Sequence, residues 1–151
     1  MNEMNMNTWT SDWMWSLPSI VVTVLLHTVS LGVMNGRAAA VLGNVRKYRM
    51  PRLVAMLVMG ATALSATVLH GIEGMIWAGA FRLLRALPEI KSAMLYSLSA
   101  MTSYGHENFY LGPQWQMMGA LEALNGLILF GLTTAFLFTI IQKVWPHVTR
   151  G

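Results

Sequence analysis

The sequence predicts an all-α membrane protein with three transmembrane helices and a re-entrant segment between the second and the third. Of its 151 residues, 55% are hydrophobic and 11% are charged, which is too apolar for a soluble domain. Charged residues are missing from three intervals, 13–36, 53–72 and 123–142. Each interval is long enough for a helix of the roughly 20 apolar residues that cross a bilayer.

The first span is expected at about 15–34, with Trp13 and Trp15 as interfacial anchors and Pro18 in its first turn. The densest basic cluster of the chain follows it. By the positive-inside rule this loop is cytoplasmic, so the N-terminus lies outside. The basic residues of the loop are Arg37, Arg46, Lys47, Arg49 and Arg52.

The second and third spans are expected at about 53–77 and 115–142. Small residues are frequent in the second span, which predicts close packing against neighbouring helices. The third span ends in the basic sequence KVWPHVTRG, which places the C-terminus in the cytoplasm.

Between these two spans, residues 90–113 are too polar to cross the bilayer whole. The first half, IKSAMLYSLSAM, predicts a short helix, and the second half predicts an extended polar strand. Irregular backbone at membrane depth is tolerated only where it is buried in protein or lines water. The segment therefore predicts a re-entrant loop in a pore.

Three stretches carry a resemblance: LHGIEGMIWAG, LYSLSAMTSYG and LGPQWQMMGALEALNGLILFGLTTAFLF. From about 69 to 144 the chain resembles the pore module of the potassium-channel superfamily, in particular small bacterial proteins of the two-pore-domain potassium channel family. The resemblance implies an N-terminal helix and basic loop in 1–52. It implies an outer helix, pore helix, filter and inner helix in 53–151. It also implies a homotetramer embedded in the lipids of a bacterial plasma membrane.

The filter pattern of that family, T-T-x-G-Y-G-D, aligns without gaps to residues 102–108. In order, these are Thr102, Ser103, Tyr104, Gly105, His106, Glu107 and Asn108. The first threonine and the first glycine match, and serine is a conservative change at the second position. His106, Glu107 and Asn108 replace the tyrosine, the second glycine and the aspartate.

A filter rewritten in this way predicts different ion chemistry. Loss of the second glycine removes backbone freedom that the carbonyl rings need. Four copies of Glu107 would form a candidate cation ring at the outer mouth, suited to monovalent or divalent cations. Because crowded carboxylates repel and His106 titrates near neutral pH, conduction is expected to depend on external pH. The alternative is that His106 and Glu107 form a hydrogen-bonded cap over a closed pore.

Four ionisable residues fall inside the predicted spans, His27, His70, Glu73 and Glu122, where such residues are functional candidates by default. His70 and Glu73 share a helix face, either as a proton or metal site or, as favoured, as a packing pair. Glu122 and Asn125 have the same spacing, and supporting the filter from behind is favoured over direct ion contact. His27 is expected to hydrogen-bond a neighbouring helix.

The inner helix carries candidate gate and cavity residues. Gly126 and Gly131 could each act as a hinge or permit close helix packing. Thr133, Thr134 and Phe138 are expected to line the inner cavity, where a ring of phenylalanines would gate the pore by dewetting.

The function expected from these features is passive cation conduction by a homotetramer. The alternatives are a potassium-selective channel and a non-conducting membrane scaffold or regulator. We expect neither an enzyme nor a cofactor beyond bound cations, because no nucleophile with a base and no phosphate-binding loop is readable, and the His106–Asn108 run lacks a second histidine. The basic residues lie at membrane edges, which indicates topology rather than nucleic-acid binding.

Overall fold

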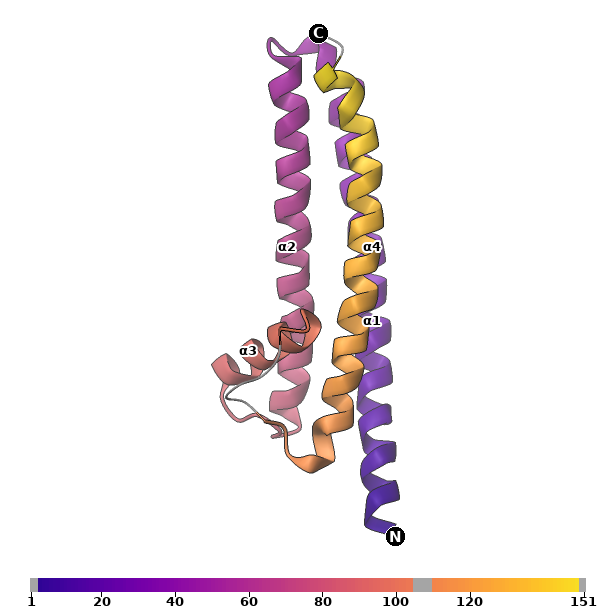
Figure 1. The fold of residues 1–151 in the computed structure, drawn as a ribbon, viewed down its shortest axis with the longest axis vertical. Helices are drawn as coiled ribbons and strands as arrows, with labels where there is room; N and C mark the ends of the chain where they lie inside the picture. Colours follow the sequence, from indigo (N-terminus) through magenta and orange to yellow (C-terminus); the bar gives the residue numbers. More distant parts are fainter. Residues whose placement is uncertain (1–2, 105–109, 150–151) are drawn as a thin grey trace. The chain divides into compact units, whose positions relative to one another are not determined.

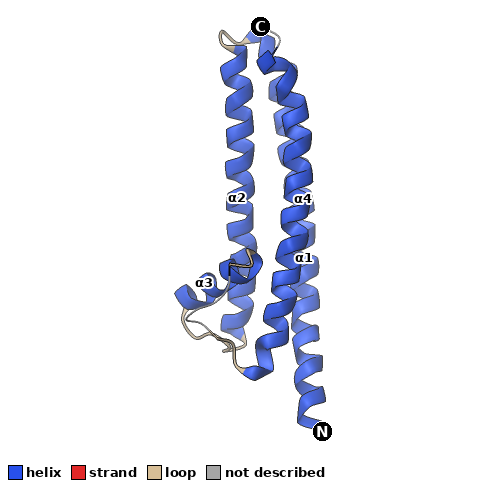
Figure 2. Cartoon of the chain, in the orientation of Figure 1, coloured by secondary structure: helices blue, strands red, loops and turns tan. Residues whose placement is uncertain are grey.

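The computed structural model describes residues 3–104 and 110–149, and this part of the chain is built of helices and connecting turns without strands (Figures 1 and 2). The elements are α1 (Glu3–Gly43), η1 (Val45–Lys47), α2 (Pro51–Leu83), α3 (Ile90–Met101), η2 (Pro113–Trp115) and α4 (Gln116–Thr149). The predicted all-helical class is therefore confirmed, and α3 covers the residues predicted as a short helix.

Among the described residues, three helices are long and apolar enough to cross a membrane, and this length and composition are those of a membrane protein. They cover Thr10–Gly43, Pro51–Leu83 and Pro113–Thr149. All three are longer than the spans expected from the sequence, because the flanking residues are mostly good helix formers and continue the helix into the predicted loops.

Helix α1 shows the largest difference from the predicted span. It continues through residues 37–42, RAAAVL, and ends at Gly43, where the Asn44 side chain donates to the Ala40 carbonyl at 3.1 Å. Pro18 lies inside the helix rather than in its first turn, so that prediction is wrong. Transmembrane helices tolerate such prolines because neighbouring groups and local adjustments satisfy the freed carbonyl.

Helices α2 and α3 end in the same kind of cap. Arg85 follows α2 with φ 56° and Ser103 follows α3 with φ 55°, both in the left-handed region. After α3, the Tyr104 amide donates to the Ser99 carbonyl at 3.0 Å, as in a Schellman motif. Each cap reverses the chain sharply at the end of its helix.

The chain divides into two compact units, which are described separately. Unit 1 comprises Met1–Leu25 and Gly71–Leu129, and unit 2 comprises Leu26–His70 and Phe130–Gly151. Each unit contains a part of α1, α2 and α4 and has its own buried apolar cluster.

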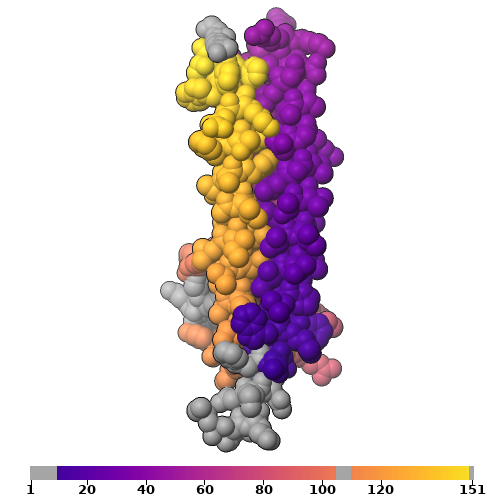
Figure 3. Space-filling view, turned by 90° about the vertical axis from the view of Figure 1, so that its right-hand side faces the viewer, coloured from indigo at the N-terminus to yellow at the C-terminus, as the bar shows by residue number. Residues whose placement is uncertain are grey.

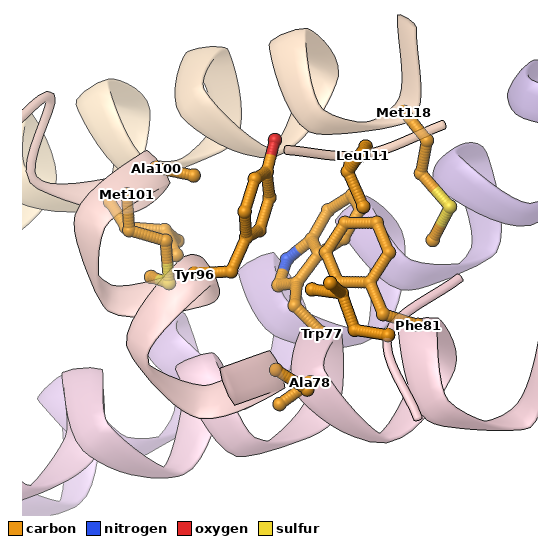
Figure 4. Close-up of a cluster of buried hydrophobic side chains, with 11 residues drawn as sticks. Trp77, Ala78, Phe81, Tyr96, Ala100, Met101, Leu111 and Met118 are labelled. Carbon is orange, nitrogen blue, oxygen red and sulfur yellow. The ribbon is translucent and has the colours of Figure 1, made fainter. Parts of the chain in front are cut away.

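The apolar core of unit 1 joins α3 to α2 and to the start of α4 (Figure 4). Trp77 and Phe81 of α2 are fully buried, and Phe81 meets the Tyr96 ring of α3 edge-on with the centroids 5.3 Å apart. Leu111, which precedes α4, and Met118 of α4 also belong to this core. This core fixes the short helix against both of its long neighbours.

The smaller core of unit 2 lies near the turn between α1 and α2. It consists of Ala38, Leu42, Ala55, Ile140 and Val144. In this unit α4 runs beside α1 (Figure 3), and the Lys143 ammonium donates to the Asn35 side-chain oxygen at 2.6 Å.

Helix α1 buries polar residues and exposes apolar ones. From residue 10 to residue 37, its fully buried side chains are Asp12, Ser16, Thr23 and His27. Leu25 and Val29 are 61% and 65% exposed. Since lipid is as apolar as leucine, polar contacts and close packing rather than hydrophobic burial attach a membrane helix to its neighbours.

Candidate functional site

The candidate site begins where α3 meets α4, at two glycines of α4. A Cβ atom on Gly126 would collide with the backbone of Met101, at the end of α3. A Cβ atom on Gly119 would collide with the Tyr96 hydroxyl. The backbone contact at Gly126 permits only glycine, so α3 approaches α4 closely at a position where the sequence omits a side chain.

The other side of α3 packs on α2. A Cβ atom on Gly74 would lie 3.2 Å from the Leu98 side chain, and Ala93 and Ala100 are buried. Both Gly74 and Gly126 belong to candidate membrane spans. Within unit 1 the short helix is therefore packed against apolar segments of two candidate spans.

Glu122 lies on α4 between the two glycines and is fully buried. The Ser97 hydroxyl of α3, also fully buried, lies beside the carboxylate. Neither carboxylate oxygen has a hydrogen-bond partner of acceptable geometry among the described residues. The Glu122 carboxylate therefore faces α3.

Asn125, one turn after Glu122, points to a different neighbour. Its amide donates to the Thr23 hydroxyl of α1 at 2.9 Å, and both residues are buried. Glu122 and Asn125, predicted to support the filter together, therefore have different neighbours within unit 1. Glu122 faces α3, and Asn125 attaches α1 to α4.

Unit 2 contains a buried cluster of two histidines and a threonine. The Thr133 hydroxyl lies 3.1 Å from His27 Nε2 and 3.0 Å from His70 Nε2. The two imidazole centroids are 5.3 Å apart, and the His70 ring stacks on Phe130 at 4.2 Å. One hydroxyl thus joins α1, α2 and α4, and His27 bonds a neighbouring helix as expected.

The proton count of this cluster restricts its tautomers. A hydroxyl has one proton to donate and two lone pairs, so Thr133 can donate to at most one Nε2. At least one of the two histidines therefore carries a proton on Nε2 and donates it to Thr133. Glu73, one helical turn after His70 in α2, is also fully buried.

The predicted filter is described in part. Thr102 and Ser103 form the cap of α3, with the Thr102 hydroxyl donating to the Leu98 carbonyl at 2.6 Å. Extended backbone, predicted from the end of α3, can begin only at Tyr104, which is 89% exposed. The remaining filter residues lie outside the described part of the chain: Gly105, His106, Glu107 and Asn108.

The candidate gate residues of α4 lie on different faces. Thr133 is buried in the histidine cluster, whereas Thr134 and Phe138 are exposed, Phe138 by 59%. A Cβ atom on Gly131 would have no neighbour within 4 Å, in contrast to Gly126. Close approach thus accounts for Gly126 but not for Gly131.

Sequence reasoning missed Thr23 and Ser97, and it expected Thr133 to line the inner cavity rather than to bond two other helices. One signal was readable for α1, because Asp12, Ser16, Thr23 and His27 are spaced by four, seven and four residues, which places them on one helix face. The polar face of a membrane helix is expected to pack against other parts of the protein. The partners on α3 and α4 carry no comparable periodic signal.

No protein-family model, no curated protein and no solved structure matches the chain.

Proposed function

We propose that the chain is the subunit of a homotetrameric cation channel, with α2 as outer helix, α3 as pore helix and α4 as inner helix. The observation that carries the proposal is the docking of α3 against apolar segments of α2 and α4 through Gly74, Gly119 and Gly126. A short helix in that position, followed by a polar segment, is the arrangement a re-entrant pore loop requires.

The exposed face of α4 supports a common axis for several subunits. Its residues recur at alternating spacings of four and three and are all exposed: Ala120, Leu124, Leu127, Gly131, Thr134 and Phe138. Such a stripe is typical of a helix that faces other helices across a shared seam. It lies on the helix surface opposite Glu122 and Thr133, which are occupied within the subunit.

In this proposal the filter is the segment Thr102–Asn108, and the acidic ring is formed by Glu107. Rings of carboxylates attract cations and favour divalent ions when they are closely packed. Potassium selectivity is expected to be weak, since the second glycine of the family pattern is missing. Bound cations are the only cofactors in this proposal, and the host is a bacterial plasma membrane with the basic loop in the cytoplasm.

The buried residues then have supporting roles. Glu122 lies against Ser97 of the pore helix, and the Thr23–Asn125 bond attaches the N-terminal helix to the inner helix. His70 and Glu73 belong to the outer helix, where they pack rather than conduct. Gly131 is the candidate hinge, because its surroundings leave room for motion.

Cation flux into liposomes that contain the purified chain tests the proposal. Wild-type protein is expected to conduct sodium and potassium, and Glu107→Gln is expected to lower cation flux and flatten its dependence on external pH between about pH 5 and 8. Glu89→Gln is the matched control, because Glu89 is an exposed carboxylate at the start of α3.

Each alternative function has its own outcome in this experiment. A reversal potential that follows potassium alone would identify a potassium-selective channel. Absence of flux in correctly assembled protein would identify a scaffold and reject conduction. An unchanged pH response in the Glu107→Gln variant would reject the acidic ring.

A further inference from the structure

A groove runs between α1 and α2 in unit 2, with a volume of about 440 Å³. It opens on the outer surface of these helices, where Val29 and Val33 are 65% and 51% exposed. The residues that define its course are Val29, Val33, Arg37 and Val41 on α1, and Ala61 and Ser65 on α2.

Three hydroxyl residues line the groove, Ser30, Thr62 and Ser65, and the hydroxyls of the two on α2 are bonded within their own helix. The Ser65 hydroxyl donates to the Ala61 carbonyl at 2.8 Å, and the Thr62 hydroxyl donates to the Val58 carbonyl at 2.7 Å. Because these groups are satisfied by their own helix, hydrocarbon can lie against them without leaving a polar group unpaired. Arg37 is the charged residue of the lining.

The length of the groove corresponds to one leaflet of a bilayer. Val29 and Val41 are separated by twelve residues of continuous helix, or roughly 18 Å along the axis, and half of a hydrocarbon core is about 15 Å. Arg37 lies about two turns along the groove from Val29, toward the end with the basic loop. A long arginine side chain there can reach the level of lipid headgroups.

The charged side chains of unit 2 are all basic. Its two segments contain no aspartate or glutamate. Their basic residues are Arg37, Arg46, Lys47, Arg49, Arg52, Lys143 and Arg150. Anionic lipid in the cytoplasmic leaflet is the counter-charge that a membrane offers to such a surface.

We propose that the groove binds one acyl chain of an anionic phospholipid, whose phosphate pairs with Arg37. A second copy of this surface would fill the apolar walls equally well. It would bring no acidic side chain to Arg37, however, because unit 2 has none. A phospholipid would fill the apolar groove with its acyl chain and pair its phosphate with Arg37. This proposal does not depend on ion conduction.

Native mass spectrometry of the full-length protein, released from detergent with phosphatidylglycerol or phosphatidylcholine, measures the retained lipid. Phosphatidylglycerol is expected to be retained in preference. Arg37→Gln is expected to weaken its retention about fivefold, the effect of one cation beside an anionic headgroup. Arg46→Gln is the matched control, because Arg46 belongs to the same basic surface but does not line this groove.

A second pair of variants tests the apolar walls. Ala61→Leu adds volume inside the groove and is expected to expel the acyl chain, whereas Gly60→Leu adds the same side chain in open space beside it and is expected to retain the lipid. Circular dichroism confirms that each variant keeps its helices. Soluble glycerol phosphate should not displace the lipid, since it lacks the acyl chain.

Three results would overturn the proposal. Equal retention of phosphatidylcholine and phosphatidylglycerol would show that headgroup charge does not contribute to binding. Equal effects of Arg37→Gln and Arg46→Gln would show that the lipid is attracted by the basic surface as a whole and not by Arg37. Efficient disulfide formation between copies carrying Val33→Cys, in a chain that otherwise has no cysteine, would show a second subunit in the groove.

Discussion

At the scale of single residues, Thr133 links α4 to both α1 and α2 within unit 2. Its hydroxyl lies within 3.1 Å of two buried histidines on two other helices. A threonine in a transmembrane helix commonly bonds its own backbone, as Thr134 does with the Phe130 carbonyl at 2.8 Å. Adjacent threonines thus have different roles, which their positions in the sequence alone do not reveal.

Thr133→Val keeps the shape of the side chain and removes the bridging hydroxyl. We expect the free energy of unfolding to fall by about 1–2 kcal/mol, because both imidazole nitrogens lose a partner in an apolar surrounding. Denaturant-induced unfolding of the protein in detergent measures this loss.

Thr134→Val is the control, and its expected change is within about 0.5 kcal/mol because the lost bond is local and exposed. Equal losses for the two variants would mean that the histidine cluster adds no stability beyond that of an ordinary helix threonine.

At the scale of elements, the position of α3 depends on glycine. Gly126→Val places side-chain atoms where the Met101 backbone lies, so α3 must move away from α4. We expect a loss of about 1–3 kcal/mol in stability, typical of overpacking, and a loss of cation flux in liposomes. Thermal unfolding and flux are measured on the same preparation.

Gly131→Ala is the matched control on the same helix. Its Cβ atom meets nothing within 4 Å, so stability should stay the same or rise by up to about 1 kcal/mol through helix propensity. Reduced flux without reduced stability in this variant would identify Gly131 as the hinge. A tolerated Gly126→Val would contradict the docking of α3.

The helices themselves were predictable to different degrees. Charge-free intervals located all three long helices, and IKSAMLYSLSAM matched α3 at both ends. The lengths of α1, α2 and α4 were underestimated, since hydropathy locates the apolar interval and not the helix ends, which depend on local caps such as Asn44. The cap at Ser103 was also unpredicted, because a left-handed serine has no distinctive sequence signal.

At the scale of the whole molecule, the proposed assembly places the exposed stripe of α4 around a central conduit. Phe138→Cys introduces a single thiol on this stripe, because the chain has no cysteine. We expect a charged thiol reagent applied from the C-terminal side to block cation flux through this variant. Electrophysiology before and after the reagent measures the block.

Thr139→Cys serves as the comparison, since the next residue is also exposed but points about 100° away around the helix. Its flux should be insensitive to the reagent. Block at neither position would place the stripe outside the pore, and block at both would show that the stripe is not the face that lines it. A mass other than four chains of 16.7 kDa would reject the tetramer.

The sequence by itself determined that the chain is apolar enough to enter a membrane and where its three long helices and the short α3 lie. These follow from composition and spacing, because a bilayer imposes length and apolarity on any helix that crosses it. Tertiary structure decided which polar groups meet: Glu122 with Ser97, Thr23 with Asn125, and Thr133 with two histidines. Such pairings join residues up to 106 positions apart, and their geometry exists only when helices pack, so no local pattern encodes them.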